Sequence, residues 1–243
     1  MDSQFQLWNI PIWAGSFDQA INRLLQITKM GSGAVIHFVN VHTLVESSEN
    51  SALKSCYLQT QAWNLPDGMP IARAVRKLAQ HAEKISGPDF METFLTRFPE
   101  MPMGFIGGTP EVQKTLSQRF RLSNATFYNP PMRPFSPENA REDFEKLSVI
   151  SRKNGSLPLL IWVGLGAPKQ ELWMQAVAKI APQSVFLGVG AAFDFLGGRI
   201  QRAPVWMQNL GLEWFHRFLQ DPRRLGPRYL RSNLRYLLKS TLD

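Results

Sequence analysis

The stretch LLIWVGLGAPKQELWMQAVAKIAPQSVFLGVG, residues 159–190, decides the fold class. It begins with the apolar run 159–163, continues through the amphipathic segment 168–180, and reaches a second apolar run at 184–187. Short apolar runs bounded by Gly and Pro are typical of buried strands, and the segment between them has helical spacing. A strand, a helix and a strand in this order predict a parallel pair of strands joined by a helical crossover.

The same alternation occurs upstream. We expect strands at 35–41, 62–65, 103–106 and 125–128, and helices at 44–58, 70–81, 87–98 and 138–153. This pattern predicts an α/β fold, with a Rossmann-like, mostly parallel sheet flanked by helices. No strand-like run follows Gly198, where the sequence predicts two or three helices. We therefore place an α/β catalytic core at 1–197 and a basic helical appendage at 198–243.

The composition is that of a globular protein. The chain has 243 residues, of which 44% are hydrophobic, and this length supports one substantial core. The single cysteine, Cys56, permits no intrachain disulfide and no zinc-type cluster, which fits a reducing cytosol. The N-terminus has Asp2 where a signal peptide would be positively charged, and no apolar run is long enough to span a bilayer.

Positive charge is concentrated near the C-terminus. The formal net charge is +8, and residues 199–243 carry nine Lys or Arg against three Asp or Glu. Such a segment suits phosphates, nucleic acid or an anionic membrane, although a merely solvated surface explains it equally well. No zinc finger, RRM or recognition-helix signature accompanies the charge, so we expect no nucleic-acid partner.

The appendage contains two groups of cations. Arg217, Arg223 and Arg224 follow a Trp-Phe pair, and their guanidinium groups can hold a diphosphate in bidentate fashion. The second group recurs at helical spacing: Arg228, Arg231, Arg235 and Lys239. An apolar stripe lies next to it: Leu230, Leu234, Leu237 and Leu238. The two stripes predict either a basic amphipathic helix on an anionic membrane surface or a terminal helix docked on the core by its leucines.

Three glycine-rich turns follow predicted strands, at 107–108, 164–166 and 188–190. Ligands in open α/β sheets bind at the carboxyl ends of strands, where helix N-termini offer N–H groups to phosphate. Each turn alone is explained by a tight strand-to-helix connection, but three on one rim favour a phosphate-bearing ligand. Lys169 stands where a third glycine would complete the dinucleotide fingerprint, so support for an NAD site is weak.

Three aspartates are acidic candidates. Asp67 stands between a proline and a glycine at a predicted strand end, on a turn that suits a general base, although a turn-forming Asp is the commoner role. Asp89 follows a Gly-Pro pair and suits a helix cap. Asp194 lies among apolar residues, so it needs a hydrogen-bond partner or a ligand. The four histidines do not cluster at ligand spacing and no Asp-x-Asp pair occurs, so we expect no metal site.

Several motifs together resemble a known family. They are LPDGMP at 65–70, ISGPDF at 85–90, GFIGGTPEV at 104–112, GLGAPKQELW at 164–173, and GVGAAFDFLGG followed by RAPVWMQNLGLEWFHRFLQDPRRL. Over about residues 35–230 the chain resembles the WecG/TagA/CpsF glycosyltransferases, glycosyltransferase family 26. The resemblance implies inverting, metal-independent transfer of a sugar from a UDP-sugar to a polyprenyl-diphosphate-linked saccharide in cell-surface polysaccharide synthesis. It also implies a peripheral enzyme at the inner, cytoplasmic face of the membrane, with an anionic surface as partner and no cofactor. N-acetylmannosamine, its uronic acid and glucose are all compatible donor sugars.

The resemblance also assigns roles to residues. It makes Asp67 the catalytic base, places Asn40 and Gln170 against the sugar nucleotide, and gives Arg217 and Arg224 the diphosphate leaving group. Further substrate-binding candidates are Lys84, Asp89, Gly107, Gly108, Gly190 and Asp194. Two positions depart from the family pattern: Phe38 replaces a threonine, and Lys84 replaces an arginine, which keeps the charge but loses the bidentate fork.

Two other functions remain open at this point. The glycine turns also suit a Rossmann oxidoreductase that binds a nucleotide cofactor, and the basic end alone would suit a non-enzymatic membrane-surface module. The sequence leaves open whether the protein forms a homo-oligomer.

Overall fold

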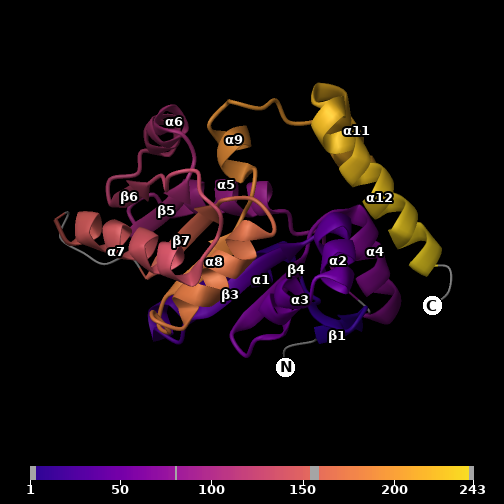
Figure 1. The fold of residues 1–243 in the computed structure, drawn as a ribbon, viewed down its shortest axis with the longest axis horizontal. Helices are drawn as coiled ribbons and strands as arrows, with labels where there is room; N and C mark the ends of the chain where they lie inside the picture. The colour runs from indigo at the N-terminus through magenta and orange to yellow at the C-terminus, as the bar shows by residue number, and fades with distance from the viewer. Residues whose placement is uncertain (1–3, 80, 154–158, 241–243) are drawn as a thin grey trace.

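The main sheet of the computed structural model has six parallel strands (Figure 1). The structure describes residues 4–79, 81–153 and 159–240, without the side chains of residues 209, 224, 227–229 and 240. The strands are β3 (Ala34–Val39), β4 (Ala62–Pro66), β5 (Met103–Gly107), β6 (Ala125–Tyr128), β7 (Leu160–Gly164) and β8 (Val185–Gly188). Their order is β4-β3-β8-β7-β5-β6, and every pairing is parallel. The predicted Rossmann-like α/β fold is confirmed.

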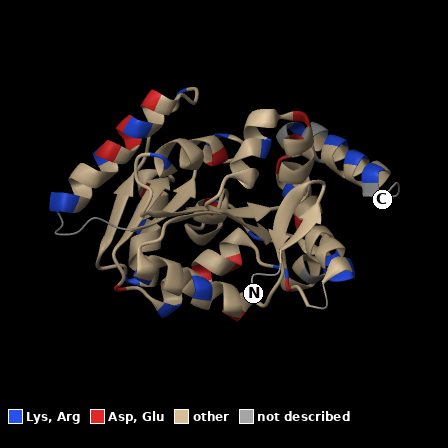
Figure 2. Cartoon of the chain, turned by 90° about the horizontal axis from the view of Figure 1, so that it is seen from below, with Lys and Arg blue, Asp and Glu red and all other residues tan. Residues whose placement is uncertain are grey.

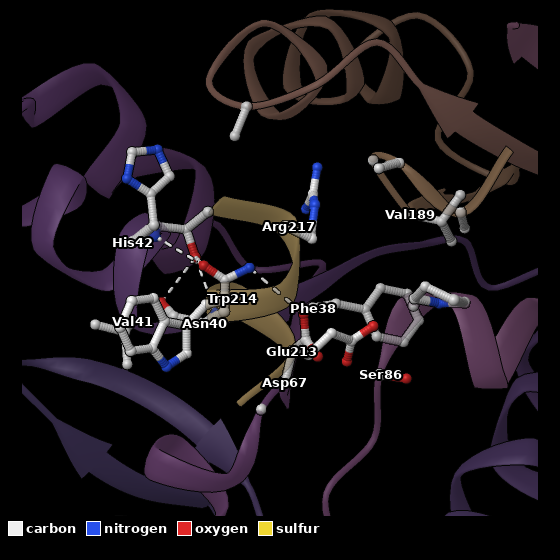
Figure 3. A pocket seen from close by; sticks show the side chains of 18 of the residues that line it. Phe38, Asn40, Val41, His42, Asp67, Ser86, Val189, Glu213, Trp214 and Arg217 are labelled. Carbon is white, nitrogen blue, oxygen red and sulfur yellow. Dashed lines mark hydrogen bonds between the residues drawn. The ribbon is translucent and has the colours of Figure 1, made fainter. Parts of the chain in front are cut away.

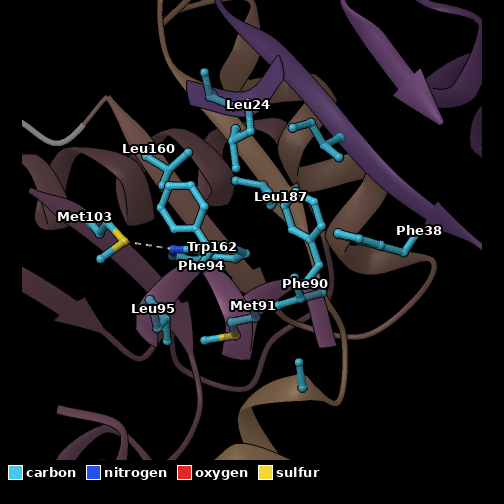
Figure 4. Close-up of a cluster of buried hydrophobic side chains, with 14 of the residues drawn as sticks. Leu24, Phe38, Phe90, Met91, Phe94, Leu95, Met103, Leu160, Trp162 and Leu187 are labelled. Atoms are coloured by element: carbon cyan, nitrogen blue, oxygen red, sulfur yellow. Dashed lines mark hydrogen bonds between the residues drawn. The ribbon is translucent and has the colours of Figure 1, made fainter. Parts of the chain in front are cut away.

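Helices cover both faces of this sheet, because alternate strand residues point to opposite sides. Leu160 and Trp162 of β7 pack into a core beneath one helical layer, where Trp162 Nε1 donates to Met103 Sδ at 3.3 Å (Figure 4). That layer consists of α1 (Phe17–Met30), α5 (Gly87–Arg97), α6 (Pro110–Phe120) and α9 (Ala192–Leu196). Ile161 and Val163 face the other layer, α7 (Pro137–Lys153) and α8 (Lys169–Ala178).

A third group of elements borders the β4 edge. It consists of the antiparallel hairpin β1 (Gln4–Leu7) and β2 (Ile10–Trp13), with α2 (Val41–Glu49), α3 (Ser51–Leu58) and α4 (Met69–Leu78). The Asn64 side chain holds the hairpin beside β4 by donating to the Pro11 carbonyl at 2.9 Å. The helical character expected at 44–58 is confirmed, but the stretch is divided: α2 ends at Glu49, and Asn50 caps a new helix by accepting from the Leu53 N–H.

In the described part of the chain, α9 is followed by three further helices: α10 (Val205–Leu210), α11 (Glu213–Gln220) and α12 (Pro222–Ser240). Figure 1 shows α11 and α12 as a long arm that runs past α2 and α4. The predicted division at residue 197 stays a prediction, although no described residue after Gly188 forms a strand. Among the described helices, none combines the length and the hydropathy that crossing a bilayer requires.

Candidate functional site

A cavity of about 440 Å³ lies at the carboxyl ends of β3, β4, β7 and β8. Its floor is the set of loops that follow these strands, and α11 and α12 close its other side (Figure 3). The cavity brings together eight predicted or implicated positions: Phe38, Asn40, Asp67, Lys84, Gln170, Gly190, Asp194 and Arg217. Its volume suits a small molecule rather than a macromolecule.

Asp67 is the first residue after β4 and points into this cavity (Figure 3). Its N–H donates to the Val39 carbonyl at 2.9 Å, which ties the end of β4 to the end of β3. Gly68 has a φ of 81°, a left-handed conformation that favours glycine and turns the chain into α4. The backbone therefore fixes this carboxylate at the sheet edge.

The surroundings of Asp67 favour its protonated form. Burial and the nearby Glu213 carboxylate raise its pKa, while a hydrogen bond from Asn40 and the charge of Lys84 lower it, and the result is a pKa of about 7. The Asn40 Nδ2 atom lies 3.4 Å from Asp67 Oδ2. A carboxyl group with this pKa can accept a proton near neutral pH, as a general base must.

Asn40 connects the end of β3 to α2. Its side-chain oxygen accepts from the Thr43 N–H at 3.1 Å, and its backbone N–H donates to the Thr43 hydroxyl at 3.0 Å. The two residues therefore form a reciprocal cap at the start of α2. Because the cap fixes the side-chain oxygen of Asn40, the side-chain nitrogen Nδ2 points toward Asp67. Asn40 thus orients the candidate base in addition to lining the cavity.

Gln170 organises the turn that follows β8. It is buried, its Oε1 accepts from the Gly190 N–H at 3.0 Å, and its Nε2 donates to the Gly188 carbonyl at 3.3 Å and to Glu171 at 2.9 Å. These bonds occupy both ends of the amide. The structure therefore gives Gln170 a role in shaping the cavity wall as well as a place in its lining.

Asp194 and Arg217 lie on the same part of the wall. Asp194 is partly buried, and its partner is an arginine, since Arg199 Nη1 lies 3.3 Å from Asp194 Oδ1. The Arg217 guanidinium lies 5.4 Å from the centre of the Phe195 ring, a cation–π distance that holds it at the cavity. Arg217 is therefore a positive group in the lining, contributed by α11.

Some predicted residues lie elsewhere. Asp89 does not line the cavity, because it forms a bidentate ion pair with Arg202. Gly107 and Gly108 do not line it either. A Cβ at Gly107 would come within 2.7 Å of the Gly164 carbonyl oxygen, so close packing of β5 against β7 explains this glycine. The side chains of Arg224 and Arg228 lie outside the described part of the structure.

The stripes of α12 face in unexpected directions. Arg231 and Arg235 both pair with Glu49 of α2, and the Lys239 Nζ lies 4.3 Å from the centre of the Trp8 ring. Leu230 is 72% exposed, and the other three leucines of the stripe are also exposed. The expectation of a helix docked by its leucines is wrong, because polar and cationic residues make the contact instead.

Two residues at or beside the cavity were not predicted as functional: Glu213, which lines it, and Arg202, which pairs with Glu213 from outside the lining. Glu213 opens α11 in the GLEW segment, and Arg202 precedes Ala-Pro in the link from α9. Only tertiary contacts reveal their importance: Arg202 Nε lies 3.2 Å from Glu213 Oε1, and the other guanidinium nitrogens bind Asp89. No spacing rule connects positions 89, 202 and 213.

The lining thus combines a carboxylate that can accept a proton, an arginine from α11, and a rim of strand-end loops. Among the described residues, no group of three His, Cys, Asp or Glu side chains comes together as metal ligands would. Comparison with protein-family models matches residues 5–243 to the description "Glycosyl transferase WecG/TagA/CpsF family".

Proposed function

The chain belongs to this family of glycosyltransferases, and from that premise we propose that it transfers a sugar from a UDP-sugar to a polyprenyl-diphosphate-linked saccharide. The family description supports the transferase class and cell-surface polysaccharide synthesis. The donor nucleotide, the lipid-linked acceptor and inversion at the sugar carbon are our proposals.

The observation that carries the proposal is the position and ionisation of Asp67. It lies at a strand end inside the cavity, and burial together with Glu213 raises its pKa to about 7. Direct displacement at a sugar carbon needs a base for the acceptor hydroxyl, because the hydroxyl itself is the nucleophile and no covalent glycosyl-enzyme intermediate forms. Asp67 has both the place and the proton affinity for this task.

The reaction then follows from the two walls of the cavity. The acceptor oxygen attacks C1 of the sugar from the face opposite the diphosphate, and Asp67 takes the hydroxyl proton. The bond from C1 to the diphosphate oxygen breaks, and UDP leaves with the bonding electrons. Arg217 stabilises the charge that develops on the β-phosphate, an electrostatic contribution that is usually the largest in such reactions.

The other cavity residues hold the substrates in place. Asn40 orients Asp67, and Gln170 fixes the glycine turn on which the nucleotide would lie. Lys84 offers a further positive charge in the lining. We propose that these cations, joined by Arg224, neutralise the diphosphate without a metal ion.

The lipid-linked acceptor places the enzyme at a membrane, and we propose the inner face. The exposed leucine stripe of α12 supports a membrane contact, because it lies on the arm that closes the cavity. The positive charge of this arm, visible along α12 in Figure 2, suits anionic lipids.

The test is UDP release across a panel of UDP-sugars, with a short polyprenyl-diphosphate N-acetylglucosamine as acceptor. We expect turnover with one donor and none without acceptor. Asp67→Asn should reduce kcat by about two orders of magnitude, the usual contribution of a general base, with donor binding nearly unchanged. Turnover like that of the wild type in this variant would refute the assignment of Asp67.

A further inference from the structure

Arg202 joins two parts of the chain that lie far apart in sequence. Its Nη1 and Nη2 atoms lie 2.5 and 2.9 Å from the two carboxylate oxygens of Asp89, and its Nε lies 3.2 Å from Glu213 Oε1. The side chain is only 18% exposed, so these interactions are shielded from solvent more than ordinary surface pairs. One guanidinium therefore connects the first turn of α5 to the first residue of α11.

The Asp89 end of this connection is firmly placed. The Ser86 hydroxyl donates to Asp89 Oδ2 at 2.5 Å, and Ser86 also caps α5. Burial alone would raise the pKa of Asp89, but hydrogen bonds from Arg202 and Ser86 outweigh it and hold the pKa below its ordinary value. Asp89 is thus a charged anchor on the core, next to residues 86–88, which line the cavity.

The Glu213 end faces the candidate base. Glu213 lines the cavity together with Asp67, and Figure 3 shows the two side chains directed into the same part of it. The groups that act on Asp67 are Glu213 from α11, Asp89 from α5, Lys84 from the preceding loop, and Asn40 from the end of β3. Of these four, Glu213 alone belongs to the C-terminal helices.

We propose that Arg202 is a positioning residue of the transfer reaction: it clamps the C-terminal helices onto the core and fixes the Glu213 carboxylate beside Asp67. Asp67 then becomes a strong base only while the site is closed. The inference rests on the proposed role of Asp67. It adds that Arg202 makes the basicity of Asp67 depend on whether the C-terminal helices are packed on the core. Before closure the aspartate remains ionised and hydrated, and closure raises its affinity for the acceptor proton.

The first test is the pH profile of kcat for the wild type, Glu213→Gln and Arg202→Met. Glu213→Gln removes the charge beside Asp67, and Arg202→Met releases α11 and hydrates the site, so both lower the pKa of Asp67. The acid limb of each profile should therefore move down by about one pH unit, the usual effect of one nearby charge. Glu92→Gln is the matched control. Glu92 lies on the same helix as Asp89 and also forms an ion pair with an arginine, Arg119, but it does not line the cavity.

A purely structural role predicts a different result. It would lower kcat equally at every pH and leave the acid limb in place, and that outcome in both variants would overturn the inference. Arg202→Lys keeps the charge but loses the fork, so we expect a shift smaller than that of Arg202→Met.

The second test needs no sugar transfer. The infrared band of a protonated carboxyl group, taken as the difference between each protein and its Asp67→Asn counterpart, reports the titration of Asp67 directly. We expect the midpoint near pH 7 in the wild type and about one unit lower in both variants. Unchanged midpoints would contradict the clamp even if UDP release confirms the transferase. Shifted midpoints would support the clamp even if the proposed acceptor is wrong.

Discussion

Asp67 keeps its proton in the folded protein up to about pH 7, whereas the ordinary pKa of the group is 3.8. Between these two values the folded state binds more protons than the unfolded state. The contribution of this group to the free energy of unfolding is therefore greatest below about pH 4. It decreases as the pH rises from about 4 to about 7, and it is lost above about pH 7. The candidate base thus makes the fold less stable at the pH where it would work.

The residue-scale prediction is that Asp67→Asn stabilises the protein against urea at pH 8. The uncharged amide avoids the cost of ionising a buried carboxyl group, which is up to about 4 kcal/mol because each pKa unit corresponds to about 1.4 kcal/mol. At pH 4.5, less than one unit above the ordinary pKa of 3.8, the gain should fall to about 1 kcal/mol. Asp18→Asn, at an exposed ion pair with Arg97, is the control. A gain of equal size at both pH values would contradict the assignment.

Gln170 permits a second prediction at this scale. Gln170→Leu would leave the Gly190 N–H and the Gly188 carbonyl without their side-chain partner, at a cost of about 1–3 kcal/mol. We expect a lower Tm and a higher KM for the donor, since the glycine turn loses its support. Gln175→Leu is the comparison, because Gln175 lies on the same helix and its bond to Ser55 is exposed. Normal Tm with a raised KM would instead indicate direct contact between Gln170 and the donor.

Local patterns of strand ends and glycine turns pointed to Asp67 and Asp194, whereas Asn40 and Gln170 were assigned by the family resemblance. In a parallel sheet the carboxyl ends of the strands share one edge, so residues that follow different strands come together there. Arg202 and Glu213 could not be found this way. Their pairing depends on how the arm after Gly198 folds back, and no local rule gives that path.

The helix α12 is held at the element scale by specific polar contacts with the core. Glu49 pairs with Arg231 and Arg235, and His42 Nδ1 lies 3.0 Å from the Ser232 hydroxyl. Tyr236 adds a hydrogen bond of 3.3 Å to the Pro70 carbonyl. Because Glu49 takes part in both ion pairs, most of the electrostatic attraction between α12 and α2 depends on this residue.

We therefore predict that Glu49→Gln loosens α12. Partly exposed pairs contribute about 0.2–1 kcal/mol each, so amide hydrogen exchange in α12 should become about twofold to tenfold faster. Raising the salt concentration should speed exchange in the wild type and have little further effect in the variant. Glu145→Gln, which breaks an exposed pair within α7, should leave α12 unchanged. Equal exchange in Glu49→Gln and the wild type would show that the ion pairs do not hold the helix.

The elements that escaped sequence-based prediction lacked the usual signals. The β1–β2 turn uses Trp8 and Asn9, both with positive φ, where a glycine would have marked a hairpin. Asn50 interrupts 44–58 without a Gly or Pro, so the segment looked continuous. In α12 the sequence showed two stripes, but the direction of each depends on Glu49, which attracts the arginines inward and leaves the leucines outside.

At the scale of the whole molecule, the outward leucines lie on the same arm as the cavity wall. Arg217 and Glu213 face inward from α11, while Phe215 and Leu219 of that helix are exposed. The α12 leucines continue this apolar character at helical spacing. Exposed apolar side chains in such a number mark a surface that is covered during function. The lipid-linked acceptor that we propose gives a reason for a membrane to cover it.

The last prediction concerns this surface. Leu230→Ser combined with Leu234→Ser should weaken sedimentation with vesicles of anionic phospholipid by about 100-fold, because each buried leucine contributes about 1.5–3 kcal/mol. Turnover of a short, water-soluble acceptor should stay close to the wild type, since neither leucine lines the cavity. Met132→Ser alters a fully exposed apolar residue on a distant loop and should bind vesicles normally. If the double variant binds vesicles normally, the membrane contact lies elsewhere. If it instead loses activity on the soluble acceptor, the leucines serve the closed site rather than the membrane.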